Sequence, residues 1–413
     1  MTDNYNYKKK IAVIGGGPAG MMAAGTAIDC GAEVTIFEHT DRLGKKLAIT
    51  GKGRCNVTNN CSVNDFMENV TRNPRFLYTA LYAFPPEKAI EFFEELGVKL
   101  KTERGNRVFP DDDKAKTIVD AMRRYSKNAE VIYENVTAVM KNGDETFTVK
   151  AKSNYQFDAV ILATGGKSYP LTGSDGSGFR IASKLGHSVT ELKPSLIPIE
   201  SPSKLCSQMM GLSLKNVGIK ILDSSEKTLY TDFGEMMFTH FGVTGPMILS
   251  ASAHIKDSDI STLTLSIDLK PALDEKTLDA RLLSDFKKSA NKDFLNSLSA
   301  LLPSKMIEPF ISVTGIDPHK KINSITKEER HKILVTLKDF RIPLKTLRPI
   351  EEAIITSGGI EVKEINPKTM ESKLIPGLYF AGEMIDVDAY TGGFNLQIAY
   401  STGFIAGKSA AEF

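Results

Sequence analysis

A βαβ-like segment near the N-terminus constrains the fold more than any other part of the chain. It begins with a short apolar run, Ile11 to Ile14, which a glycine turn, Gly15 to Gly20, follows at once. An Ala- and Met-rich helical stretch comes next, and a second apolar run then ends at the acid Glu38. Strand, glycine turn, helix, strand and carboxylate in this order predict an α/β domain of Rossmann-like type that binds a dinucleotide.

The turn and the acid have separate roles in holding the dinucleotide. Gly15 permits the tight turn, Gly17 lets backbone N–H groups approach a pyrophosphate, and Gly20 lets helix and strand pack closely. The helix N-terminus adds partial positive charge, and Glu38 is placed to accept hydrogen bonds from a ribose, which favours FAD or NAD over NADP. We therefore predict cofactor contacts from Gly15, Gly17, Pro18, Ala19, Gly20, Glu38 and the adjacent His39.

Two later segments indicate which dinucleotide is bound. Near the C-terminus an apolar run reaches Gly382-Glu383, and a loop leads through Gly392-Gly393 into a helix of small and apolar residues. In many FAD proteins a late segment of this kind binds the ribityl chain and the flavin ring, with the helix N-terminus beside the flavin. Residues 159–166 are similar to the strand-to-loop ATG motif of such proteins. The two segments favour FAD, bound non-covalently, and predict contacts from Thr164, Gly165, Gly166, Gly382, Glu383, Asp386, Gly392, Gly393, Phe394, Asn395 and Gln397.

Residues 39–60 form a loop rich in Gly, Lys and Arg, with five cations between positions 42 and 54. Such a loop is either a solvated basic segment or a strap over the pyrophosphate and flavin. Its position directly after Glu38 favours the strap, because cations there can reach ligand oxygens. The predicted ligand contacts of the strap are Lys45, Lys46, Gly53, Arg54, Cys55 and Asn56.

The strap also carries a family resemblance. The blocks RLGKK (42–46) and TGKGRCNVTN (50–59) resemble the signature of the BaiN/YhiN-like flavoproteins, whose members are often labelled aminoacetone-oxidase-family FAD-binding enzymes or NAD(P)/FAD-dependent oxidoreductases. GNRVFP (105–110), FTHFGVTGP (238–246) and TSGGI (356–360) match further blocks of that family. The similarity covers almost the whole chain. It implies an FAD domain interrupted by an insert, with the backbone near Val136 beside the adenine.

Composition shifts around residues 192–194 and again near 342–343 support a discontinuous first domain. We predict an FAD-binding domain made of 1–194 and 343–413, interrupted by an insert at 195–342. The insert reads as β-rich over 195–270 and as helical over 271–342.

Two local predictions concern the first domain. The β-branched runs 130–140 and 146–151 flank an Asn-Gly pair, which predicts a hairpin. Asp113 precedes an amphipathic stretch at 114–127 and is predicted to cap that helix.

Charge and apolar content limit the class of protein. There are 52 basic and 50 acidic residues, which gives no indication of a nucleic-acid partner. No apolar run approaches the length of a transmembrane helix, and the N-terminus lacks the apolar core of a secretory signal. The expectation is a cytoplasmic enzyme that acts on a small molecule, with no nucleic-acid partner and an oligomeric state that the sequence leaves open.

The four cysteines are Cys30, Cys55, Cys61 and Cys206. None forms a CxxC pair and no histidine stands at zinc-ligand spacing, so reduced thiols and no metal site are expected. Cys55 and Cys61 could be a redox-active pair, but their C-x5-C spacing differs from the C-x4-C of flavin disulfide reductases. Cys55 packed under the strap is the favoured interpretation.

Among six histidines, His240 is the candidate for catalysis, because it lies in a loop of small and turn-forming residues. An imidazole there could orient a substrate carbonyl or deliver a proton, while the alternative is a structural loop histidine. Tyr169 is a weaker candidate acid. No second dinucleotide fold is evident, so NAD(P)H, if it is the donor, must reach the flavin without a domain of its own.

The first functional hypothesis is an FAD-dependent oxidoreductase. The resemblance implies either NAD(P)H-linked reduction of a C=C bond conjugated to a carbonyl in a steroid-like bile acid, or oxidation of a small amine such as aminoacetone with release of hydrogen peroxide. We favour the first reaction, with substrate bound between flavin and insert near His240 and Gly358-Gly359. The apolar neighbours Phe238, Phe241, Met247 and Tyr169 suit a planar enone. A non-catalytic FAD-binding interaction module is the alternative of another class.

Overall fold

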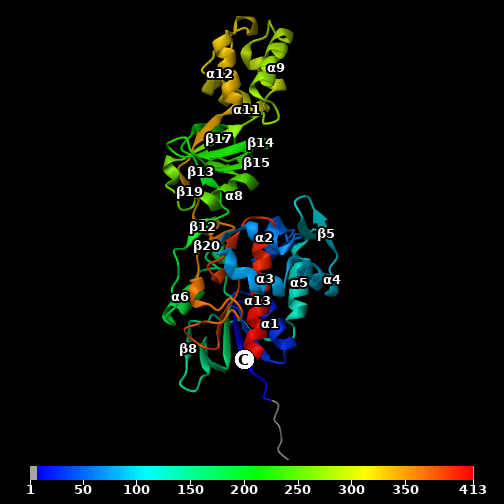
Figure 1. Cartoon of the computed structure of the whole chain (residues 1–413), viewed down its shortest axis with the longest axis vertical. Helices are drawn as coiled ribbons and strands as arrows, with labels where there is room; N and C mark the ends of the chain where they lie inside the picture. Colours follow the sequence, from blue (N-terminus) through cyan, green and yellow to red (C-terminus); the bar gives the residue numbers. More distant parts are fainter. Residues whose placement is uncertain (1–6, 413) are drawn as a thin grey trace, which may run out of the picture. The chain divides into compact units, whose positions relative to one another are not determined.

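The computed structural model describes residues 7–412, which divide into two compact units (Figure 1). Unit 1 contains the described residues up to Ser195 and those from Ile350 onward, and unit 2 spans Leu196–Pro349. Each unit has its own cluster of buried apolar side chains.

A five-stranded parallel sheet forms the centre of unit 1, in the order β21-β11-β1-β2-β7. Its strands are β1 (Lys10–Ile14), β2 (Glu33–Phe37), β7 (Glu130–Ile132), β11 (Ala159–Leu162) and β21 (Leu378–Phe380). β11 is buried along its whole length, as expected for a parallel strand covered on both faces. Helices α1 (Pro18–Asp29) and α13 (Phe394–Glu412) pack against each other beside this sheet, although they come from opposite ends of the chain.

Smaller elements surround the parallel sheet of unit 1. Its further helices are α2 (Val63–Glu68), α3 (Tyr78–Ala83), α4 (Pro86–Glu95), α5 (Ala115–Tyr125) and α6 (Ser177–Lys184). Its small sheets pair β3 (Thr58–Asn59), β6 (Arg107–Pro110) and β5 (Leu100–Glu103); β8 (Ala138–Lys141), β9 (Phe147–Lys150) and β10 (Asn154–Phe157); β4 (Val70–Arg72) with β22 (Asp388–Ala389); and β12 (Lys193–Ser195) with β20 (Ile355–Ser357).

Unit 2 is a seven-stranded antiparallel sheet with a helical part. The strand order is β18 (Phe340–Pro343), β17 (Thr264–Asp268), β14 (Ser213–Leu222), β15 (Thr228–Phe238), β16 (Gly242–Thr244), β13 (Ile199–Glu200) and β19 (Thr346–Leu347). The helices are α7 (Lys204–Gln208), α8 (Pro246–Ile255), α9 (Glu275–Lys288), α10 (Phe294–Ser297), α11 (Ser304–Thr314) and α12 (Lys327–Lys338). Because β19 pairs with β13, unit 2 extends to Pro349 and includes residues 343–349, which the sequence had placed in the other domain.

Two local predictions need correction. The run 130–140 is not one strand of a hairpin: β7 joins the parallel sheet beside β2, and only β8 pairs with β9 across the Asn-Gly turn. Asp113 does not cap α5, since Lys114 is the N-cap residue and no side chain caps it. The Asp113 carboxylate instead binds Lys101 and Arg54, so long-range ion pairs take the place of the predicted local cap.

Three further features bear on the class of protein. No helix between residues 7 and 412 is long and apolar enough to cross a membrane. Within the same range, no group of His, Cys, Asp and Glu is arranged to hold a metal ion. All four cysteines are free thiols, including Cys55 and Cys61.

Candidate functional site

The motifs found in the sequence meet at one edge of the parallel sheet. The glycine turn follows β1, Glu38 follows β2, the ATGG segment follows β11, and Gly382-Glu383 follows β21. All these strands are parallel, so their carboxyl ends lie at the same edge, which is where open α/β sheets bind their ligands. Segments more than 300 residues apart in the chain therefore share one site.

The glycine turn is shaped for an approaching ligand. Gly15 has φ +109°, and a Cβ there would lie 2.4 Å from the carbonyl oxygen of Ala163. A Cβ on Gly20 would lie 1.9 Å from the oxygen of Gly15, so α1 needs glycine to pack this closely. Gly17 differs, because a Cβ there would have no atom within 4 Å. Gly17 is also the N-cap residue of α1, and no side chain caps the helix, so its first N–H groups face open space that suits a pyrophosphate.

Glu38 is held rigidly next to this turn. Its side chain is only 8% exposed, and it accepts hydrogen bonds from the backbone N–H of Gly16 at 2.9 Å and of Thr40 at 2.7 Å. The glycine-rich loop before α6 also approaches Glu38, since a Cβ on Gly173 would lie 3.7 Å from Oε1 of Glu38. His39 is exposed beside the same loop. The carboxylate thus stands in the place expected for a ribose-binding acid.

The strap and the C-terminal motif are joined by an ion pair. Lys46 Nζ lies 3.0 Å from Oε2 of Glu383 and donates to Ser168 Oγ at 2.7 Å. The other carboxylate oxygen of Glu383 accepts from the backbone N–H of Thr356 at 2.7 Å. A Cβ on Gly166 would lie 2.5 Å from Oγ1 of Thr356, so this glycine lets the two segments touch. Sequence reasoning missed Ser168 and Thr356, although the TSGGI block contained a signal for the second.

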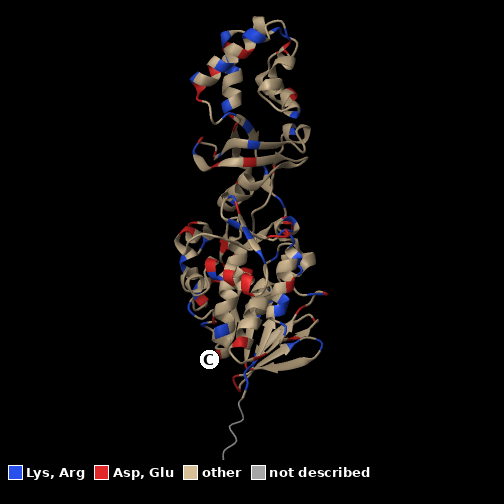
Figure 2. Ribbon diagram, turned by 90° about the vertical axis from the view of Figure 1, so that its right-hand side faces the viewer, with Lys and Arg blue, Asp and Glu red and all other residues tan. Residues whose placement is uncertain are grey.

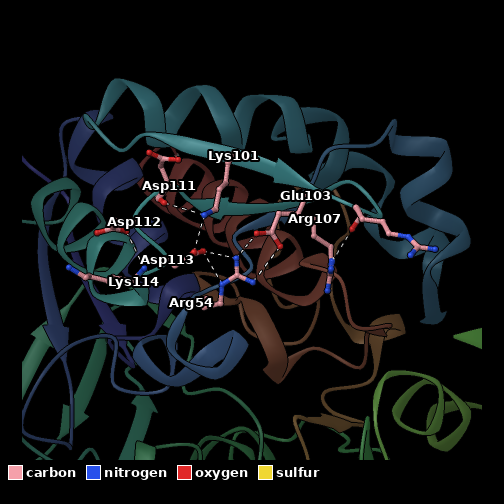
Figure 3. A network of polar contacts seen from close by, with 9 residues as sticks. Arg54, Lys101, Glu103, Arg107, Asp111, Asp112, Asp113 and Lys114 are labelled. Carbon is pink, nitrogen blue, oxygen red and sulfur yellow. Dashed lines mark hydrogen bonds and ion pairs between the residues drawn. The ribbon is translucent and has the colours of Figure 1, made fainter. Parts of the chain in front are cut away.

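The guanidinium of Arg54 belongs to a network of polar contacts within the protein (Figure 3). Its guanidinium donates to Glu103 Oε1 at 2.5 Å and to Asp113 Oδ1 at 2.6 Å, and it lies 4.2 Å above the ring of Phe109. Lys101 binds the second oxygen of Asp113 at 2.9 Å. These carboxylates raise the pKa of Arg54 and lower those of Glu103 and Asp113, through hydrogen bonds to the charged forms. Arg54 therefore anchors the strap to β5 and to the loop before α5.

The rest of the strap has an unusual backbone. Lys52 and Cys55 have φ near +58° although neither is glycine, and Gly53 also has positive φ. Cys55 is fully buried, and burial raises its pKa to about 12, so its thiol stays protonated and is no nucleophile. Asn56 Oδ1 is buried without a hydrogen-bond partner, which fits a ligand donor at this position. Lys45 pairs with Asp41 at 3.1 Å on the surface.

Two buried carboxylates follow Glu383. Asp386 receives a hydrogen bond from Arg72 Nε, and its carbonyl oxygen accepts from Asn73 Nδ2 at 2.6 Å. Asp388 accepts from Ser357 Oγ at 3.0 Å and from Thr71 Oγ1 at 2.8 Å. These contacts join β4, β20 and β22. Arg72 had no local signal in the sequence, because its partner lies 314 residues away.

The N-terminus of α13 is fixed by side chains that we had assigned to the cofactor. Asn395 bonds to both backbone groups of Ala389, and Gln397 accepts from Thr58 Oγ1 at 2.6 Å and donates to the oxygen of Phe84. Gly393 has φ +98°, and a Cβ there would lie 2.4 Å from the oxygen of Thr58. The side chains of Asn395 and Gln397 thus position the start of the helix.

The remaining candidates are dispersed. Val136 is buried in the segment between β7 and β8, and Tyr169 is partly exposed with φ +53°. His240 is exposed on the loop between β15 and β16 of unit 2, with its ring edge-on to Phe241 at 5.0 Å. Phe238 and Met247 are buried in the core of unit 2, which corrects the expectation that their side chains line a substrate pocket.

The sheet, the open glycine turn and the acid at the end of β2 define a dinucleotide-binding fold of the flavoprotein class. Residues 9–409 match the HI0933-like protein Rossmann domain, and the chain belongs to this family.

The chain is similar to proteins of two described activities. It is 28% identical to 3-dehydro-bile acid delta(4,6)-reductase of Clostridium scindens, over 98% of this chain and 99% of that protein. It is also 28% identical to the ribosomal RNA dihydrouridine synthase of Escherichia coli, over 96% and 98% of the two chains.

Solved structures support the fold. The open conformation of a flavocytochrome c3 fumarate reductase aligns with a TM-score of 0.52 at 17% identity, over 99% of this chain and 79% of the other. A 3-ketosteroid delta1-dehydrogenase from Sterolibacterium denitrificans aligns with a TM-score of 0.53 at 12% identity, over 98% and 100%. With the family assignment, the chain is an FAD-dependent oxidoreductase. The expected absence of a nucleic-acid partner is not confirmed, because one relative is named for modifying ribosomal RNA.

Proposed function

We propose that this enzyme reduces a C=C bond conjugated to a carbonyl, with FAD as redox cofactor and NAD(P)H as electron donor. The observation that carries the proposal is the convergence of four strand-end motifs around an open, uncapped helix N-terminus in unit 1. The relatives support this type of reaction, because a bile-acid Δ4,6-reductase and a dihydrouridine synthase both act on a C=C bond that is conjugated to a ring carbonyl.

The chain's own residues bind and orient the cofactor. The first turn of α1, beside Gly17, would hold the pyrophosphate, and Glu38 would accept hydrogen bonds from the ribose. Asn56 has an unpaired acceptor, and the Lys46–Glu383 pair fixes the strap to the C-terminal motif, which would bind the ribityl chain. When bound, reduced FAD supplies a hydride to the β-carbon of the conjugated system.

A proton must then reach the α-carbon, and we assign this step to His240. Its imidazole is exposed on a short loop of unit 2 and is held edge-on by Phe241. His240→Ala should slow substrate-dependent reoxidation of the reduced enzyme by about 10²–10⁴-fold, the usual contribution of a general acid. FAD content and direct reoxidation by O2 should remain as in the wild type. Wild-type rates with substrate would remove His240 from the mechanism.

Two substrate classes share the required chemistry: a steroid-like enone and the uracil ring of RNA. In both, a planar ring presents a C=C bond next to a carbonyl, so one hydride-transfer geometry serves either. The proposal that the substrate includes RNA follows from the dihydrouridine synthase relatives and requires a surface for the polyanion.

Anaerobic rapid mixing tests the proposed function. NADH or NADPH should reduce the bound flavin, and a steroid 4,6-dien-3-one or a uridine-containing RNA should reoxidise it. Rapid reduction by aminoacetone without reoxidation by either acceptor would establish an amine oxidase instead. Absence of turnover with every donor and acceptor pair would indicate a non-catalytic FAD-binding module.

A further inference from the structure

Positive charge is concentrated in the helical part of unit 2. Residues 287–293 and 317–332 contain eight basic and four acidic residues, whereas the net charge of the whole chain is only +2. The other residues together therefore have a small negative charge. Figure 2 shows Lys and Arg positions gathered at the helical end of this unit. The basic residues are Lys287, Lys288, Lys292, Lys320, Lys321, Lys327, Arg330 and Lys332.

Folding brings the two segments into contact. The N–H of Ile322 donates to the oxygen of Lys292 at 3.0 Å, and the N–H of Phe294 donates to the oxygen of Lys320 at 2.9 Å. The N–H of Asn323 donates to Ala290 at 3.1 Å, and α9 packs against α12. The end of α9, the loop after it and the start of α12 thus form one continuous surface.

Several of these cations have no structural role. Lys320, Lys321 and Arg330 pair with Glu329, Asp293 and Asp279, at 2.6, 2.7 and 2.8 Å. Lys287, Lys288, Lys292 and Lys327 are exposed and form no ion pair with any residue that the structure describes. We name these four residues the basic surface. Four unpaired ammonium groups on one surface attract anions.

We propose that the basic surface binds the phosphate backbone of an RNA whose uracil is the substrate; this inference rests on the proposed function. Lysine contacts a phosphate as a point charge, which holds a nucleic acid without reading its sequence. A steroid or a nicotinamide donor is too small to contact charges that are spread over two helix ends. Selection of the reacting base then depends on the site in unit 1 and on the shape of the RNA.

The composition of the surface favours RNA over a membrane. Peripheral membrane binding needs apolar or aromatic side chains next to the cations. Among the described residues, no large hydrophobic side chain of 287–293 or 317–332 is exposed, and the nearest along the chain are Val335, Leu283 and Val313. Within their own two segments, the lysines of the basic surface thus have no exposed apolar neighbour, which fits a phosphate-binding face better than a membrane anchor.

Binding of a labelled oligouridylate of about 30 nucleotides to the FAD-loaded enzyme tests the inference by fluorescence anisotropy. The triple variant K287E/K288E/K292E should bind at least ~10-fold more weakly at about 100 mM salt. The slope of log affinity against log salt concentration should become less negative by about two, which corresponds to three lost phosphate contacts on a single strand. The neutral K287Q/K288Q/K292Q should show a smaller loss in the same direction.

The matched control is K215E/K220E/K227E, which reverses three exposed lysines on the β14–β15 hairpin of the same unit. It should change affinity less than ~3-fold. Equal weakening by both charge reversals, or no binding by the wild type, would overturn the inference. Binding of phosphatidylserine vesicles but not of RNA, lost in K287E/K288E/K292E, would assign the surface to a membrane and would also overturn it.

Turnover separates this inference from the proposed function. The variant K287E/K288E/K292E should reduce a steroid 4,6-dien-3-one at the wild-type rate but lose reduction of RNA uridines. Normal reduction of RNA uridines by this variant would refute the basic surface and leave the function standing. Loss of RNA binding in the variant, with no reduction of enone or uridine by the wild type, would support the surface and refute the function.

Discussion

Gly17 differs from its neighbouring glycines because no contact within the protein excludes a side chain at this position. The neighbouring Gly15 and Gly20 are required by contacts within the protein, because a Cβ on either would lie within 2.4 Å of a backbone oxygen. Gly17 has a φ of −78°, which any residue can adopt, and no atom lies within 4 Å of the place of its missing Cβ. The protein itself does not need glycine here, which supports the proposed pyrophosphate position beside Gly17.

Gly17→Ala should therefore leave the stability of the apoprotein unchanged and weaken FAD binding by roughly 10-fold or more, because a methyl group would occupy space next to the pyrophosphate. Titration of apoprotein with FAD, followed by flavin fluorescence, measures the affinity. Gly143→Ala is the control, since Gly143 also has open space around it but lies in the β8–β9 turn. Unchanged FAD affinity in Gly17→Ala would contradict the assigned pyrophosphate position.

His187 makes the stability of unit 1 dependent on pH. It is buried, its Nε2 lies 2.9 Å from Ser372 Oγ, and its Nδ1 has no partner. Burial lowers its pKa below the usual value near 6.5, so the unfolded state binds a proton more readily than the folded state. Stability should thus be complete above about pH 6.5 and fall as pH decreases through that value.

Chemical denaturation at pH 7.5 and at about pH 5.5 measures this effect. The wild type should lose stability over this range, and His187→Gln should lose less. Replacement of the exposed His331 by Gln should leave the wild-type dependence in place. An identical pH dependence in His187→Gln would show that another group is responsible.

At the level of helices, α1 and α13 form the contact that unites the site. α1 begins at the glycine turn and α13 begins after Gly393, so their packing sets the distance between the two cofactor motifs. Gly403 and Gly407 of α13 face α1, and a Cβ there would lie 2.5 Å from the oxygen of Ala19 and 2.2 Å from that of Ala23. Two glycines one turn apart therefore allow the helix backbones to touch.

Gly407→Ala should destabilise unit 1 by about 1–3 kcal/mol, because the overpacking exceeds the gain of about 1 kcal/mol in helix propensity. Thermal unfolding measures the change. Lys408→Ala, on the partly exposed side of the same helix, should be close to neutral. A more stable Gly407→Ala variant would mean that the helices do not approach as closely as described.

For the full chain, the cofactor should contribute substantially to stability. A ligand that binds only the folded state, at a free concentration of about 100 times its Kd, adds about 2.7 kcal/mol. Removal of FAD should therefore lower the unfolding temperature by roughly 3–5 °C, and added FAD should restore it. FMN, which lacks the adenosine that Glu38 is placed to bind, should restore little of the loss. Equal rescue by FMN and FAD would remove Glu38 and the glycine turn from cofactor binding.

The sequence alone determined the class of this protein. Strand periodicity, the glycine turn before α1 and the acid at position 38 are local properties, because neighbouring residues set backbone conformation and helix N-termini. Gly382-Glu383 and the ATGG segment could be recognised for the same reason. These signals were sufficient for a Rossmann-like fold and for FAD, and the family match confirms the resemblance.

Only the tertiary structure decided which side chains meet. Lys46 pairs with Glu383 across 337 residues and Arg72 with Asp386 across 314, and neither pair leaves a local pattern. Asp113 does not cap α5, because its carboxylate pairs with residues distant in the chain. The cluster of lysines around Lys287 could not be inferred from the total charge, which is nearly neutral. The physical reason is that strand order and helix packing choose the partners, and these depend on the burial of the whole chain rather than on any one segment.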